Sequence, residues 1–329
     1  MQYLIQVFSM KIVVTGATGH IGSYIIKDLG VQFPKSKIVI IDNMMTQRYS
    51  SLFNLPKLGN YNFIEGDVNH LDLSKIFSGA NIVIHLAAIT DAAGSFDRAK
   101  ELEDNNYRST VKVANACIST GASLIALSST SVYGTQNSIV DENCSDEELQ
   151  PQSPYASTKL KEEKLISKLC NEKGLKAIHC RFGTIFGASP GMRFHTAVNK
   201  FCWQASMGLP ISVWSTAYDQ KRPYLDLLDA SRAIEFIIKN DLFDGRIYNI
   251  LTLNATVRQV VDILKDFVPS LELGFVDNKI MNQLSYEVSC KRFEAEGFKF
   301  NGDLKRGIAE TIALLKQCNN GCLKSSYIL

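Results

Sequence analysis

The sequence predicts an α/β protein: a doubly wound parallel sheet followed by a smaller mixed α/β C-terminal domain. Short β-branched apolar runs recur in the first half of the chain, separated by stretches long enough for crossover helices, and the loops lengthen after about residue 180. The 329 residues are enough for two domains. We expect residues 10–180 to form the first domain, completed by a returning segment near 225–250. Residues 181–329 should form mainly the second.

The expected strands of the first domain are short, and apolar residues at helical spacing lie between them. Ile21, Ile25 and Leu29, for example, fall on one face of a helix that would follow the first strand. The segment "RIYNI" at 246–250 has the pattern of a further strand that returns to the first sheet. The five strands expected before residue 130 are 11–15, 37–41, 62–65, 82–86 and 124–128.

Composition excludes several classes of partner. Hydrophobic residues make up 46% and charged residues 21%, as in soluble globular proteins, and no apolar run approaches the roughly 20 residues that span a bilayer. The formal charge of +2 is nearly balanced and the cations are scattered. We therefore expect neither a membrane nor a nucleic acid as partner.

The eight cysteines show no repeating spacing, so they do not predict a disulfide framework. Cys318 and Cys322 are close together, but no histidine lies nearby, and we expect no metal site. The N-terminal "MQYLIQVFS" lacks the basic region and the long apolar core of a secretory signal. A reducing, cytoplasmic location follows as the expectation.

A glycine-rich turn lies near the start of the chain, in "VVTGATGHIG", residues 13–22. Gly16, Gly19 and Gly22 can form a tight turn that brings backbone N–H groups and a helix N-terminus close to a diphosphate. Asp42 follows Gly22 by twenty residues, where a carboxylate can accept hydrogen bonds from a ribose. That carboxylate would repel a 2′-phosphate, which favours NAD over NADP. Because Arg48 is near in sequence, NADP stays an alternative cofactor. The simpler interpretation of Arg48 is a solvated cation in a loop.

A second motif carries acid–base chemistry. In "SPYASTKLKEE", Tyr155 and Lys159 are four residues apart, so they share one face of the expected helix. A cation beside a phenol makes the phenol more acidic, as a general base at neutral pH requires. The preceding strand ends in hydroxyls at 128–131, at the carboxyl edge of the sheet where ligands bind. One of these hydroxyls can hold a substrate oxygen beside the tyrosine.

In this order the motifs resemble the extended short-chain dehydrogenase/reductase family, in particular its nucleotide-sugar epimerases and dehydratases, which have a Rossmann fold. The resemblance runs from about Met10 to about Leu315 and includes "TGATGHIG", "IDN", "EGDV", "IHLAA", "SSTSVYG" and "YASTK". "NYRST" is similar to a helix start that carries the family's structural asparagine. The resemblance implies that NAD binds Gly16, Thr18, Gly19, His20, Ile21, Gly22, Asp42, Asn43, Asp67, Val68, Leu86, Ala87, Ala88, Asn106, Ser128, Tyr155 and Lys159.

The same resemblance implies the catalytic and substrate residues. Ser129, Tyr155 and Lys159 take the catalytic positions, and "RPYLDLLDASRAI" puts Arg222 at the position that reaches a substrate diphosphate, where a guanidinium suits phosphate oxygens. The alternative for Arg222 is an ordinary surface arginine in a loop. Substrate contacts are expected from Ser129, Thr130, Thr184 and Arg222.

Two departures from the family pattern narrow the reaction. Dehydratases carry an acidic pair just after the catalytic Ser or Thr, and decarboxylases a Glu two positions after it. Thr130 and Ser131 occupy these positions here, which disfavours elimination of water. Thr184 stands where many relatives have an asparagine that holds the nucleotide sugar. The loop at 91–101 is expected to face the sugar.

These features together predict an NAD-dependent epimerase of a nucleotide-linked sugar, acting at C4 by transient oxidation and hydride return. The family resemblance further implies a homodimer through helices near 100–120 and 155–170. Two alternatives remain at this point. One is an NAD(P)-dependent sugar dehydrogenase or reductase of the same family, and the other is a non-catalytic scaffold that binds the dinucleotide.

Overall fold

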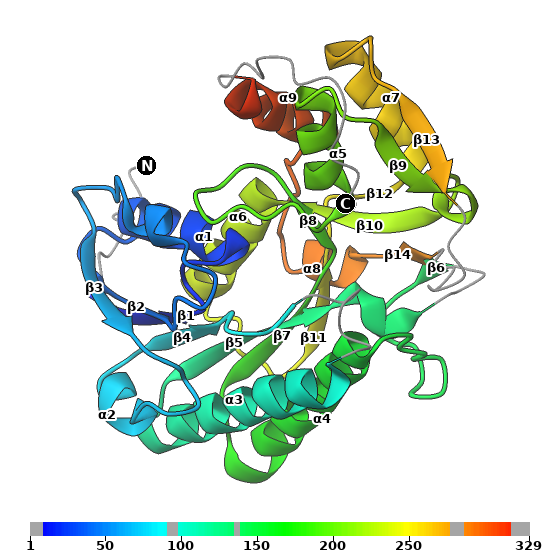
Figure 1. Cartoon of the computed structure of the whole chain (residues 1–329). Helices are drawn as coiled ribbons and strands as arrows, with labels where there is room; N and C mark the ends of the chain where they lie inside the picture. Colours follow the sequence, from blue (N-terminus) through cyan, green and yellow to red (C-terminus); the bar gives the residue numbers. More distant parts are fainter. Residues whose placement is uncertain (1–8, 91–97, 135–138, 277–285, 317–329) are drawn as a thin grey trace, which may run out of the picture.

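The computed structural model describes residues 9–90, 98–134, 139–276 and 286–316. Its largest sheet has seven parallel strands in the order β11-β7-β5-β4-β1-β2-β3, with helices on both faces (Figure 1). The predicted fold class is confirmed. The strands are β1 (Lys11–Thr15), β2 (Lys37–Asp42), β3 (Asn60–Glu65), β4 (Ile82–His85), β5 (Ser123–Ser129), β7 (Ala177–Phe182) and β11 (Ile247–Ile250).

The two faces of this sheet bury two separate apolar cores. Ile12 and Val14 of β1 lie in the core on one face, and Val13 between them lies in the core on the other. A parallel sheet covered on both faces needs such continuously apolar strands, because neither face meets water. The first core is covered by α1 (His20–Gln32) and α6 (Leu227–Lys239), the second by α2 (Leu73–Phe77), α3 (Ala99–Thr120) and α4 (Pro154–Lys173).

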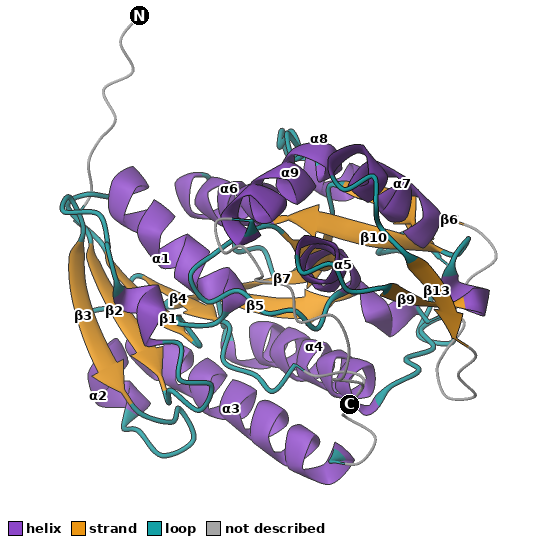
Figure 2. Ribbon diagram, turned by 45° about the horizontal axis from the view of Figure 1, so that its top comes forward, coloured by secondary structure: helices purple, strands orange, loops and turns teal. Residues whose placement is uncertain are grey.

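The remaining elements form a smaller, mixed part with its own core (Figure 2). A three-stranded sheet in the order β12-β10-β8 and the parallel pair β13-β9 lie beside three helices. The bounds are β8 (Thr184–Phe186), α5 (Ala197–Ser206), β9 (Ile211–Trp214), β10 (Lys221–Asp226), β12 (Leu253–Thr256), α7 (Val257–Phe267), β13 (Leu273–Val276) and α9 (Leu304–Leu315). A third group joins β6 (Ile139–Val140) to β14 (Glu287–Val288), with α8 (Lys291–Ala295) nearby in the chain.

The chain passes between the two parts more than once. After β10 it returns through α6, which packs on α1, and through β11, which pairs with β7 at the edge of the large sheet. The expected return near 225–250 corresponds to these elements. From the carboxyl end of β7 the chain passes directly into β8 of the smaller part. The division into a cofactor domain and a substrate domain stays a prediction.

One predicted boundary is wrong. The helix expected to start at "NYRST" begins at Ala99, seven residues before Asn106, so this asparagine lies inside α3. The residues from Ala99 to Glu103 are mostly strong helix formers, which extends the helix upstream. Most of the expected sugar-facing loop, 91–97, lies outside the described residues, as do Cys318 and Cys322 and the first eight residues of the chain. In the described part of the chain, no helix is long and apolar enough to cross a membrane.

Candidate active site

The glycine turn joins β1 to α1 and is shaped by two of its three glycines. Gly16 has a φ of +66°, and a Cβ there would lie 2.6 Å from the Ala87 nitrogen. A Cβ on Gly22 would lie 2.6 Å from the Gly16 carbonyl oxygen. The fold itself therefore requires these two glycines. Gly19 differs, because a Cβ there would meet only the Gly16 oxygen at 3.2 Å and the end of Arg48 at 3.9 Å.

The N-terminus of α1 fits an anionic group. Gly19 is the N-cap and offers no side-chain hydrogen bond, so a side chain does not satisfy the N–H groups of the first turn, which includes His20 and Ile21. The Thr18 hydroxyl is buried beside this turn and has no partner. A diphosphate accepts hydrogen bonds from such a helix end. These residues therefore fit the diphosphate of a dinucleotide.

Asp42 ends β2 and ties it to the turn. One carboxylate oxygen accepts a hydrogen bond from the Thr18 nitrogen at 3.0 Å, and the other accepts one from the Met44 nitrogen at 2.9 Å. A carboxylate has about four lone-pair sites, so Asp42 keeps acceptors for a ribose diol. Burial lowers the pKa of the neighbouring Arg48, although the negative charge of Asp42 acts in the opposite direction.

Asp67 and the residues after β4 border the same edge of the sheet. Asp67 accepts hydrogen bonds from the Asn43 side chain at 3.3 Å and from the Asn69 nitrogen at 2.7 Å, and the Val68 side chain enters the core. Asn106 holds the backbone of Ile89 at both its N–H, 2.8 Å, and its carbonyl, 2.9 Å. This clamp from α3 fixes the segment that contains Leu86, Ala87 and Ala88 beside Gly16.

The hydroxyls at the end of β5 have different surroundings. Ser129 Oγ accepts hydrogen bonds from both the N–H and the hydroxyl of Ser131, at 3.2 and 2.9 Å, so its own proton is left to donate elsewhere. Ser128 Oγ is buried without a partner. Thr130 is 2% exposed, and its hydroxyl donates to the Phe182 carbonyl at 3.4 Å. Its expected contact with substrate stays a prediction.

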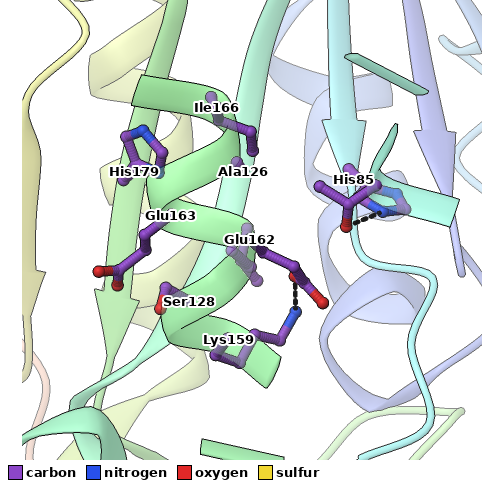
Figure 3. Close-up of a pocket in the computed structure, with 10 residues that line it drawn as sticks. His85, Ala126, Ser128, Lys159, Glu162, Glu163, Ile166 and His179 are labelled. Carbon is purple, nitrogen blue, oxygen red and sulfur yellow. Dashed lines mark hydrogen bonds and ion pairs between the residues drawn. The ribbon is translucent and has the colours of Figure 1, made fainter. Parts of the chain in front are cut away.

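Tyr155 and Lys159 lie at the start of α4. Ser153 caps this helix by accepting a hydrogen bond from the Ala156 nitrogen, and Pro154 takes the first helical position, so Tyr155 falls in the first turn. The Lys159 ammonium lies 5.9 Å from the centroid of the Tyr155 ring. Its hydrogen bond goes to a residue that our sequence reasoning missed, Glu162, at 2.9 Å (Figure 3). Burial opposes the Lys159 charge, but Glu162 and Tyr155 favour it, and the pKa of Lys159 is raised.

A second buried ion pair fixes α4 on the sheet. Arg181, on β7, donates to the two oxygens of the Glu163 carboxylate from Nε at 2.9 Å and Nη2 at 2.7 Å, and its Nη1 donates to the Tyr133 hydroxyl at 2.8 Å. The side chains of Arg181 and Glu163 are 2% and 3% exposed. This pair was also missed, because the two residues lie on separate elements. It holds the helix of Tyr155 and Lys159 in place.

Two of the four residues expected to bind substrate, Thr184 and Arg222, lie on neighbouring strands of the smaller part. Thr184 on β8 is opposite Tyr224 on β10, two residues from Arg222. Arg222 Nε and the Tyr224 hydroxyl are buried without hydrogen-bond partners, and the buried Tyr286 lies near them. Unpaired buried donors are costly unless a ligand meets them. Among the described residues, no group of three or more His, Cys, Asp or Glu could hold a metal ion.

Comparison with known proteins identifies the family. The family model described as "NAD dependent epimerase/dehydratase family" matches residues 12–250. The chain belongs to this family. The membership confirms the resemblance found in the motifs and confirms NAD as the cofactor. Whether the reaction is an epimerisation or a dehydration is left open by the family itself.

The names of relatives within the NAD dependent epimerase/dehydratase family describe enzymes that act on nucleotide sugars. A trifunctional UDP-glucose 4,6-dehydratase/UDP-4-keto-6-deoxy-D-glucose 3,5-epimerase/UDP-4-keto-L-rhamnose-reductase of Arabidopsis thaliana is 29% identical over 318 residues, 92% of this chain and 46% of that protein. The chain thus spans about half the length of that relative. A Bacillus subtilis (strain 168) protein, named uncharacterized UDP-glucose epimerase YtcB, is 28% identical over 267 residues, 78% of this chain and 82% of its own.

The fold is shared with solved structures of the family. The UDP-glucuronic acid 4-epimerase of Bacillus cereus, in complex with UDP-glucuronic acid and NAD, has a TM-score of 0.83 and covers 94% of this chain and 99% of its own. At 23% identity this likeness shows the fold alone. The homodimer, the cytoplasmic location and the roles of the individual site residues stay predictions.

Proposed function

We propose that this protein is an NAD-dependent epimerase that inverts a nucleotide-linked sugar at C4. The observation that carries the proposal is the chemistry around Ser129. The helix of Tyr155 and Lys159 packs against β5 and the turn that begins after Ser129. The next two side chains are hydroxyls of Thr130 and Ser131, not carboxyl groups. This set supports oxidation and reduction of a sugar alcohol but offers no acid for elimination of water.

In the proposed reaction, Tyr155 acts as a phenolate that takes the proton of the sugar hydroxyl. Lys159 stabilises the phenolate and can hold the nicotinamide ribose, and Ser129 donates its free proton to the same sugar oxygen. NAD+, held at the glycine turn, would supply the hydride acceptor for that carbon and the hydride donor for the opposite face of the keto-sugar. After the keto-sugar has turned over, Tyr155 returns the proton to the oxygen, so no net oxidation occurs.

Arg222 and Thr184 support the proposal that the protein binds its substrate through a nucleotide diphosphate. The Arg222 guanidinium has a buried Nε with no partner, which a phosphate oxygen can satisfy. Thr184 lies on the adjacent strand and offers a short hydroxyl. A fixed diphosphate lets the sugar turn while it stays bound, as return of the hydride to the other face requires.

Other reactions of the family make distinguishable products. We would incubate the protein with NAD+ and a panel of nucleotide sugars in deuterated water and record product mass and nicotinamide absorbance together. Epimerisation gives a stereoisomer at unchanged mass without accumulating NADH. A product lighter by one water would reveal a dehydratase. A two-unit mass change with one NADH per product would reveal a dehydrogenase.

The Tyr155→Phe variant tests the role of the phenol and separates an enzyme from a scaffold. We expect turnover to fall at least about a thousandfold, because the general base is lost while the ring stays in place. NAD binding, measured by fluorescence titration, should stay within about threefold of wild type, since the glycine turn is untouched. Unchanged turnover would remove Tyr155 from the mechanism. Absence of any turnover in the wild type would favour the scaffold.

A further inference from the structure

A charged residue of α4, Glu162, lies on the same helix face as Tyr155 and Lys159. The steps from 155 to 159 and from 159 to 162 are four and three residues, so all three positions share one face of the helix. Glu162 Oε2 lies 2.9 Å from Lys159 Nζ, and the two side chains are only 6% and 8% exposed. The Thr110 side chain also hydrogen-bonds this carboxylate. Glu162 is thus a buried acid in direct contact with Lys159.

The surroundings of this pair hold few competing charges. A small cavity behind the pair is lined by His85 of β4, Thr110 of α3, Ser128 of β5 and His179 of β7 (Figure 3). Burial lowers the pKa of His85 to about 3 and that of His179 to about 4, so both are neutral at pH 7.

One further acid faces the same cavity, and it is already engaged. The Glu163 carboxylate is bound by Arg181 through both of its oxygens. Among the described residues that line the cavity, Glu162 is therefore the anion whose hydrogen bond goes to Lys159.

We infer that Glu162 is a positioning residue that holds the Lys159 ammonium and offsets part of its electric field at the Tyr155 phenol. This inference deepens the proposed function and rests on it, because it assigns a task toward the proposed general base. A cation 5.9 Å from the phenol ring favours the phenolate, and an anion in contact with that cation weakens the effect. The same anion keeps the buried lysine protonated.

Removal of the Glu162 charge therefore has two effects of the same sign. In Glu162→Gln the Tyr155 phenol ionises at lower pH, because it no longer meets the field of the anion. The Lys159 ammonium also loses its proton at lower pH, because its counter-ion is gone. Both limbs of the pH–rate profile should move to lower pH, the limb of Lys159 by more than that of Tyr155, because Glu162 contacts the ammonium. A purely structural role would lower the rate without moving either limb.

The direct test is a titration of Tyr155 that does not depend on turnover. Tyrosinate absorbance is recorded against pH for each protein and for the same protein with Tyr155→Phe, and the difference isolates Tyr155. We expect the midpoint to fall by about one pH unit in Glu162→Gln and to stay unchanged in Glu162→Asp, which keeps the charge. The matched control is Glu172→Gln, an exposed acid on the same helix paired with Lys168 at 4.0 Å.

The outcomes separate this inference from the proposed function. A midpoint in Glu162→Gln equal to that of wild type overturns the inference, whatever the enzyme does with nucleotide sugars. A lowered midpoint in a protein that turns over no nucleotide sugar supports the inference and overturns the proposed function. Circular dichroism checks that each variant is folded. If the glutamine variant does not fold, Glu162→Ala carries the same expected shift.

Discussion

Acidification should destabilise this protein through its buried histidines. His20, His85 and His179 are 5%, 6% and 1% exposed. Burial is the main cause that lowers their pKa values from 6.5, to about 4 for His20, about 3 for His85 and about 4 for His179. All three are therefore neutral in the folded protein, while in the unfolded chain they bind protons as soon as the pH falls below about 6.5.

The sign and size of the effect follow from proton linkage. Between about pH 6.5 and pH 4 the unfolded chain binds more protons than the folded protein, so the free energy of unfolding decreases as the pH decreases. At about pH 5 each histidine lowers it by about 2 kcal/mol, and the three together by about 6 kcal/mol. A typical net stability is about 5–15 kcal/mol. Glu142 and Glu162 oppose part of this loss, because burial raises their pKa values.

The assay is urea denaturation followed by circular dichroism at about pH 7.5 and about pH 5. His179→Gln removes one buried histidine, so the stability lost between the two pH values should shrink by about 2 kcal/mol. His70 is exposed, and His70→Gln serves as the matched control with no expected change. If wild type were equally stable at both pH values, or if the two variants lost the same stability, the linkage argument would be refuted.

Three further substitutions test single contacts. Glu163→Gln leaves Arg181 buried without its anion, so the free energy of unfolding measured by equilibrium denaturation should fall by about 3 kcal/mol. A loss below about 1 kcal/mol, which is typical of exposed ion pairs, would contradict a structural role for this pair. Gly22→Ala places a Cβ 2.6 Å from the Gly16 oxygen and should cost about 1–3 kcal/mol, and an unchanged melting temperature would show that α1 can shift. Gly191→Ala places a Cβ 2.2 Å from the Thr18 carbonyl oxygen in the glycine turn, so the Kd for NAD, measured by fluorescence titration, should rise about tenfold. An unchanged Kd would show that this loop does not affect cofactor binding.

Local patterns carried most of what the sequence could predict. The glycine spacing at Gly16, Gly19 and Gly22 and the four-residue spacing of Tyr155 and Lys159 express the geometry of one turn and one helix, so they can be read without knowing the fold. The strands were predictable for the same reason, because a sheet buried on both faces needs continuous apolar runs. The start of α3 was misplaced because its N-cap, Arg98, is not one of the residue types that usually cap helices, and its side chain makes no capping hydrogen bond.

Contacts between distant segments could not be predicted in this way. His20 opens α1, yet its Nε2 donates to the Gly187 carbonyl at 2.9 Å, 167 residues later. Nearby, the Gly191 nitrogen donates to Ser23 Oγ at 2.9 Å. The loop after β8 thus packs on the first turn of α1, which couples the cofactor turn to the smaller part of the molecule. Only the fold brings these residues together, and spacing along the chain carries no signal of it.

Glu162 and Glu163 show how one helix can separate anchoring from chemistry. Consecutive residues of an α-helix point about 100° apart, so the two carboxylates of α4 meet different neighbours. Glu163 meets Arg181 on β7 and fixes the helix on the sheet, while Glu162 turns back along its own helix to Lys159. Loss of the first charge should therefore appear as lost stability, and loss of the second as a shifted titration of Tyr155. Because the two effects are read by different measurements, the tuning of Tyr155 can be tested apart from the support of the helix that carries it.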